Sequence, residues 1–158
     1  MRFLLILCLL SFSASAQTDL LADIRANISS IFQDSGLCSR FEARFEKVDV
    51  STNAILKGYK GSVFMAQGRH ASNPFTKLSV FNKGKALLDE AIKMDGKNLE
   101  LRFLRLTIQV NVPGILNYSY QIEEDHAFIN KNLATVSNPE FKKQVTAFLT
   151  KAKAEGKL

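Results

Sequence analysis

Apolar residues recur every three or four positions through most of the chain, and this spacing restricts the fold to one built from amphipathic helices. Short polar segments rich in glycine, asparagine or proline interrupt the pattern at residues 33–36, 70–74, 95–98 and 111–114. Such residues favour turns over regular structure. We therefore predict an all-α fold of about six to seven helices, arranged as antiparallel hairpins or as an irregular helix bundle.

The apolar stripes place the helices between these breaks. They predict helices over residues 19–32, 37–48, 55–68, 75–94, 99–110, 122–133 and 139–150. The segment 99–110 is apolar on nearly every side, so we expect a central helix there. A β-strand is the alternative for this segment, because its apolar residues can also be read with a period of two. Residues 115–120 are expected to be irregular, and the tail 151–158, with its three lysines, is expected to fray.

Glycines and caps add detail to two of these helices. Gly58, Gly61 and Gly68 lie in or at the end of the third predicted helix, where each glycine costs about 1 kcal/mol relative to alanine. We expect another helix to approach closely at these positions. Asn73 with Pro74 is typical of a helix start. The segment 137–140 predicts a capping box at the start of the last helix.

Residues 1–16 have the pattern of a cleavable signal peptide, with Arg2, a short apolar run and Ala14 and Ala16 at the cleavage positions. A lipoprotein signal at Cys8 is the alternative, but this cysteine lies inside the apolar run. The run is far shorter than the roughly 20 residues of a membrane-spanning helix. We predict a signal peptide, 1–16, followed by one all-helical domain, 17–158, exported to the periplasm or secreted, with no integral membrane segment in the mature chain.

Charge and cysteine content restrict the partners of the mature chain. Loss of Arg2 reduces the 21 basic residues to 20, against 15 acidic residues. This modest excess, with both signs interspersed, favours solubility, and we expect no nucleic-acid partner. Only Cys38 remains after cleavage, so no intramolecular disulfide can form. Stability must come from an apolar core, which a domain of about 150 residues can supply.

Residues 54–98 resemble a single tetratricopeptide-like (TPR-like) repeat. Gly84, Leu88 and Ala91 match the small, bulky and alanine positions of its second helix, and Gly96 takes the place of the usual proline. The preceding helix, with Gly61, is similar to the first helix of the pair. The resemblance implies a helical repeat, the architecture of a protein-interaction module.

The mature chain also resembles an uncharacterised family of small exported bacterial helical proteins. The similarity is carried by the segments 58–61, 70–75, 99–105 and 122–125. It implies an exported helical fold and no particular activity.

Few residues are candidates for chemistry. Glu123 and His126 have the spacing of half a di-metal carboxylate site, but no second pair accompanies them. We therefore predict neither a bound metal nor another cofactor; if a metal binds, Glu123 and His126, with His70, are the residues to test. Cys38 beside Leu37 is expected to be a buried apolar residue, with a reactive thiol as the alternative.

Two loop segments mix aromatic and hydrogen-bonding side chains, as recognition sites do. The candidate binding residues are His70, Asn73, Phe75, Tyr118 and Tyr120. The alternative is that Phe75 and Tyr118 only close the ends of the helix bundle.

The sequence contains neither a phosphate-binding loop nor a serine-hydrolase elbow. We expect a non-enzymatic protein-interaction module of the cell envelope, with another envelope protein as its partner. A carrier of an apolar or anionic small ligand is the alternative, and a metal-dependent enzyme built around His126 is a weaker one.

Overall fold

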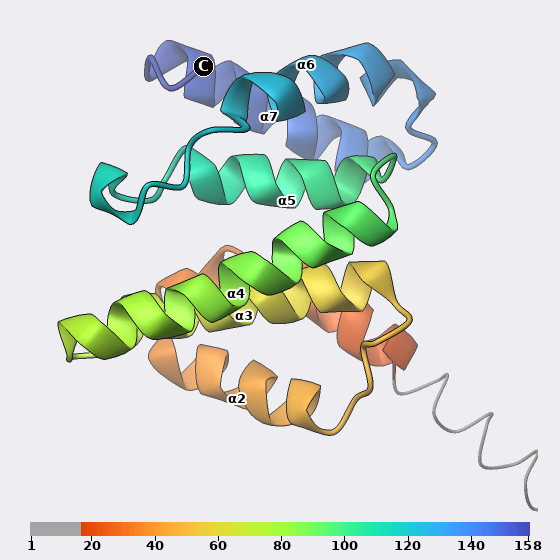
Figure 1. Cartoon of the computed structure of the whole chain (residues 1–158). Helices are drawn as coiled ribbons and strands as arrows, with labels where there is room; N and C mark the ends of the chain where they lie inside the picture. Colours follow the sequence, from red (N-terminus) through yellow and green to blue (C-terminus); the bar gives the residue numbers. More distant parts are fainter. Residues whose placement is uncertain (1–16) are drawn as a thin grey trace, which may run out of the picture. The chain divides into compact units, whose positions relative to one another are not determined.

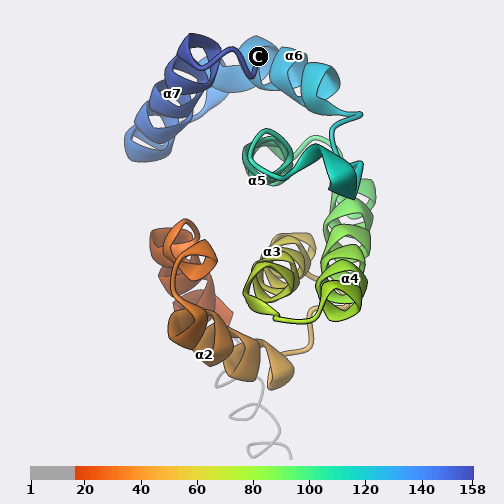
Figure 2. The same cartoon turned by 90° about the vertical axis from the view of Figure 1, so that its left-hand side faces the viewer.

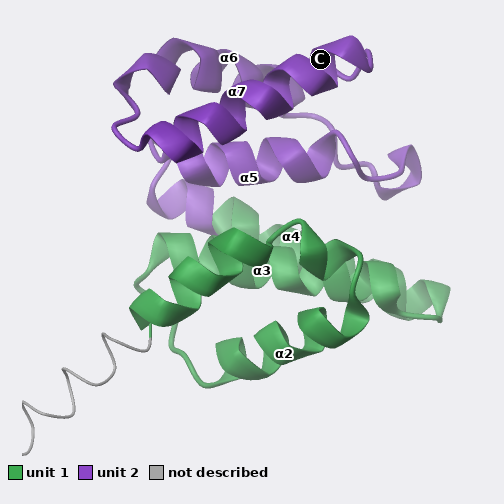
Figure 3. Ribbon diagram, turned by 180° about the vertical axis from the view of Figure 1, so that it is seen from behind, with its two compact units in different colours: residues 1–90 green, residues 91–158 purple. Residues whose placement is uncertain are grey.

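The structure is a computed structural model that describes residues 17–158 (Figure 1). The predicted signal peptide and Cys8 lie outside the described residues. All regular elements within 17–158 are helical, which confirms the predicted all-α class. The chain divides into two compact units, unit 1 (residues 1–90) and unit 2 (residues 91–158) (Figure 3).

Unit 1 is built around α3. Its elements are a helix over residues 17–27, η1 (Ser30–Phe32), α2 (Ser35–Glu46), α3 (Ala54–His70) and α4 (Pro74–Met94), whose last turn belongs to unit 2. α3 contacts both α2 and η1. α3 and α4 run antiparallel, side by side, and residues 71–73 join them (Figure 1, Figure 2). A helix packed from several directions needs small residues, and α3 supplies them.

Two glycines bring α3 and α4 into backbone contact. A Cβ atom on Gly61 would lie 2.6 Å from the carbonyl oxygen of Gly84 and 2.9 Å from the amide nitrogen of Leu88. Further along, a Cβ atom on Gly68 would lie 2.9 Å from the carbonyl oxygen of Lys77. The close approach predicted at Gly61 and Gly68 is confirmed, and its neighbour is α4.

The variant Gly61→Ala should lower the free energy of unfolding by about 1–3 kcal/mol, because backbone atoms of α4 must move to admit the methyl group. Chemical denaturation followed by circular dichroism measures the change. Gly114→Ala is the matched control, since no atom lies within 4 Å of its added Cβ. A Gly61→Ala variant as stable as the control would contradict the packing described.

Unit 2 packs three α-helices around an aromatic core. Its elements are α5 (Leu99–Gln109), η2 (Gly114–Leu116), α6 (Ile122–Asn132), η3 (Leu133–Thr135) and α7 (Pro139–Ala154). The ring of Phe103 meets those of Phe141 and Phe148 edge-on, with centroids 5.8 and 5.4 Å apart. Leu106 and Ile129 belong to the same core. Residues 99–109 are helical in α5, so the strand alternative for the segment 99–110 was wrong.

The C-terminal helix differs from prediction at both ends. Asn138, and not a capping box from Ser137, caps α7: its Oδ1 accepts hydrogen bonds from two backbone amides at 3.0 Å. The tail expected to fray continues α7 to Ala154. Ala152 is buried and Leu158 packs against the core of unit 2. The fraying prediction was wrong because these apolar residues extend the buried stripe of α7 between lysines that face outward.

Candidate functional site

The predicted loop surface at residues 70–75 lies at the end of the α3–α4 hairpin, and we call residues 69–78 the hairpin tip. Two of its predicted binding residues hold the turn. The Oδ1 atom of Asn73 accepts hydrogen bonds from the amides of Phe75 at 2.8 Å and Thr76 at 3.2 Å, which caps α4. The His70 ring lies 2.8 Å, Nε2 to oxygen, from the carbonyl of Ile31, so Nε2 donates. Phe75 itself is 85% exposed and available for contact.

The two candidate tyrosines lie in unit 2 and differ in exposure. Tyr118 is buried, at 1% exposure, whereas Tyr120 is 60% exposed. Their rings meet edge-on, with centroids 6.2 Å apart. Asn117, just before them, adopts a left-handed backbone conformation with φ of 46°. Tyr118 therefore has an interior position, and of the two tyrosines only Tyr120 is accessible to a ligand.

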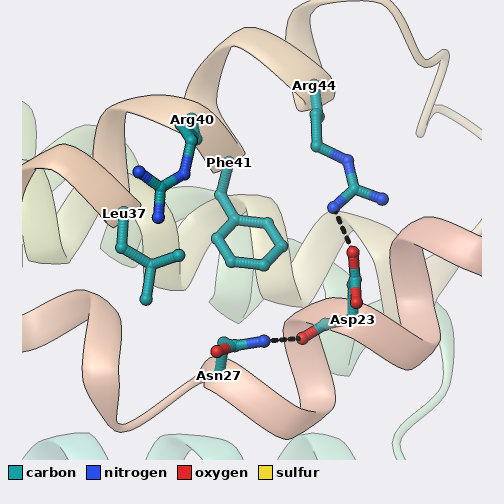
Figure 4. Close-up of a pocket in the computed structure, with 6 residues that line it drawn as sticks. All are labelled: Asp23, Asn27, Leu37, Arg40, Phe41 and Arg44. Atoms are coloured by element: carbon teal, nitrogen blue, oxygen red, sulfur yellow. Dashed lines mark hydrogen bonds and ion pairs between the residues drawn. The ribbon is translucent and has the colours of Figure 1, made fainter.

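A pocket in unit 1 was not predicted from the sequence. It lies between the helix over 17–27 and α2, with a volume of about 160 Å³ (Figure 4). Its lining residues are Asp23, Asn27, Leu37, Arg40, Phe41 and Arg44. Four of these share one face of α2, at the i, i+3, i+4 and i+7 spacing.

The two arginines of the pocket have different electrostatic surroundings. Arg44 forms a 2.6 Å ion pair with Asp23, and its guanidinium carbon lies 5.4 Å from the ring centroid of Phe41. The Arg40 guanidinium has no hydrogen bond or ion pair within residues 17–158. The pKa of Asp34 is lowered, mainly by a hydrogen bond from the Leu37 amide and to a smaller extent by the charge of Arg40. The pocket thus offers one cation without a direct ion pair, Arg40, beside the apolar side chains of Leu37 and Phe41.

The predicted metal pair belongs to α6. Glu123 is exposed, and His126 is half-buried with its Nε2 lacking a hydrogen-bond partner. Burial lowers the pKa of His126, and the charge of Lys153 lowers it further. Within the described residues, no group of three or more histidine, cysteine or acidic side chains is placed to hold a metal ion. Because the pKa of His126 is lowered, protonation of its ring destabilises the fold: stability is kept above pH 6.5 and falls as the pH drops from there through the lowered pKa.

A buried ion-pair network occupies the start of α6. Asp125, fully buried, accepts from Nε and Nη2 of Arg105 at 2.6 and 2.8 Å and from Nη1 of Arg102 at 3.0 Å. Arg102 also pairs with the exposed Glu124 and lies over the ring of Phe128. The two arginines belong to α5, and the two acids belong to α6. They join α5 to α6.

Replacing Asp125 by Asn should lower the free energy of unfolding by about 3–5 kcal/mol, because the buried guanidinium of Arg105 loses its ion pair with this carboxylate and Arg102 keeps only its pair with the exposed Glu124. Thermal and chemical denaturation measure the loss. Glu124→Gln is the matched control: its side chain is exposed, so the expected change is below about 1 kcal/mol. Equal effects of the two substitutions would refute a structural role specific to Asp125.

Cys38 lies inside unit 1. It is 1% exposed, and its Sγ donates to the carbonyl of Val63 at 3.6 Å. Burial raises the pKa of the thiol to about 11, with a further contribution from the charge of Glu42. The thiol is therefore protonated near neutral pH, as expected of a buried apolar residue.

None of the helices within 17–158 combines the length and the apolar character that a bilayer crossing needs. No protein-family model matches the chain, and neither a curated protein nor a solved structure shows significant similarity to it.

Proposed function

We propose that the chain is an exported, non-enzymatic protein-interaction module of the cell envelope, which binds its partner at the pocket between the helix over 17–27 and α2. The observation that carries this proposal is Arg40, which forms no direct ion pair within the described residues, beside the apolar Leu37 and Phe41. A partner that presents an apolar side chain next to a carboxylate would contact both the apolar residues and Arg40.

The size of the pocket favours a partner's side chain over a carried ligand. Sites for drug-sized ligands occupy about 300–1,000 Å³, whereas this pocket has about 160 Å³. One anchoring side chain in a small pocket is typical of protein interfaces. The TPR-like hairpin of α3 and α4 would then be the scaffold, because α3 packs against α2 and fixes the pocket face.

Export predicts that the mature protein begins at Gln17. Intact mass spectrometry of the protein from the envelope fraction of its own host should give the mass of residues 17–158. The variant Ala16→Asp, which places a charge at the cleavage site, should accumulate uncleaved. An uncleaved wild-type chain in the cytoplasm would refute export and leave the pocket proposal to be tested separately.

The pocket is tested by charge reversal. A photo-crosslinking residue at position 37 should capture one polypeptide in the host, and Arg40→Glu should reduce that product by at least about tenfold, because it repels the partner's carboxylate. Lys143→Glu makes an equal charge change at an exposed position of α7 and should leave the amount of crosslinked product unchanged. Undiminished capture by Arg40→Glu, or no captured polypeptide, would contradict the proposal.

A further inference from the structure

The hairpin tip exposes apolar surface that the folded chain does not cover. Phe75 is 85% exposed and Leu78 is 46% exposed. They are three residues apart in α4 and so lie on one face of its first turns. In Figure 1 this end of α4 extends beyond the end of α2. The exposed side chains therefore lie on a protruding tip rather than in a hollow.

The same hairpin has no acidic side chain before Asp89, near the end of α4. No Asp or Glu occurs between Asp49 and Asp89, whereas this stretch contains six basic residues: Lys57, Lys60, Arg69, Lys77, Lys83 and Lys85. Acidic and basic residues are interspersed elsewhere in the chain, but residues 50–88 contain only basic ones. Arg69 and Lys77 are exposed at the tip. The tip thus combines a positive charge excess with an exposed aromatic ring.

Close packing holds the tip in place. The Nζ atom of Lys77 donates to the carbonyl oxygen of Arg69 at 3.1 Å, which ties the start of α4 to the end of α3. Gly68 lies against the backbone of Lys77 and Phe81. Phe81 is buried, whereas Phe75, six residues earlier in the same helix, is not. With the turn capped by Asn73, the ring of Phe75 cannot reach the core without unwinding α4.

We propose that the hairpin tip docks on an anionic phospholipid surface. Phe75 and Leu78 would enter the headgroup region, where aromatic side chains are favoured, and Arg69 and Lys77 would lie against lipid phosphates. The positive tip complements the negative surface, and a protruding tip suits a deformable membrane better than a rigid protein, whose anchors fill pockets. This contact is separate from the pocket of unit 1 and does not depend on it.

The absence of tryptophan from the sequence allows a direct test. The variant Phe75→Trp places a single tryptophan at the tip, and Ile115→Trp, at a site that is 91% exposed in unit 2, is the matched control. Vesicles of phosphatidylcholine with about one third phosphatidylglycerol supply the anionic surface. We expect the emission of Phe75→Trp to shift to the blue and to be quenched by brominated lipid, and the emission of Ile115→Trp to stay unchanged.

The charges are tested in the Phe75→Trp background. Lys77→Gln and Arg69→Gln should each weaken vesicle binding about fivefold, the effect of one basic residue at an anionic surface. Lys143→Gln, far along the sequence on α7, should change it by less than about twofold. Arg40→Glu should leave the blue shift in place, which separates this proposal from that of the pocket.

Four results would overturn the proposal. They are an unshifted emission of Phe75→Trp with anionic vesicles, an equal shift with pure phosphatidylcholine, an equal shift for Ile115→Trp, and a shift without vesicles that grows with protein concentration. The last would assign the tip to self-association.

Discussion

The backbone contact between Gly61 and Gly84 is the constraint on which unit 1 depends. Two helices at this distance leave no room for a side chain at the crossing, so the direction of α4 relative to α3 is fixed there. Because only residues 71–73 join the two helices, the position of the hairpin tip is fixed as well. The exposure of Phe75 is thus a consequence of how α4 packs against α3.

In unit 2, buried ion pairs join α5 to α6. A carboxylate removed from water is costly unless its oxygens are fully paired, and Asp125 receives three donors from two arginines. Such a network tolerates few alternative arrangements, since each shift of α6 would leave a buried charge without its partner. The edge-on ring contacts of Phe103 with Phe141 and Phe148 hold α7 against α5. α5 is thus joined to α6 by ion pairs and to α7 by apolar contacts.

The fold could be predicted largely from apolar periodicity, and the candidate sites only in part: the loop that contains Phe75 was predicted, whereas the pocket was not. Helix positions and the close approach at Gly61 follow from local sequence. The stripe that contains Phe75 and Phe81 looks uniform, yet only Phe81 is covered, because coverage depends on where neighbouring helices end. The pairing of Arg105 with Asp125 spans 20 residues and has no local signature. The pocket likewise requires the placement of one helix against another, which spacing along the chain does not specify.

If the chain is exported to an oxidising compartment, as we propose, the burial of Cys38 has a consequence for its folding. An unfolded chain that has lost Cys8 with the proposed signal peptide would carry one thiol with no cysteine of its own to pair with, so it could form only mixed disulfides with other molecules. The native core has no space for such an adduct, because Sγ lies against the Val63 carbonyl at 1% exposure of the residue. Folding and adduct formation are therefore mutually exclusive. Only the reduced chain would therefore reach the native state, and a delay in folding would give mixed disulfides more time to form.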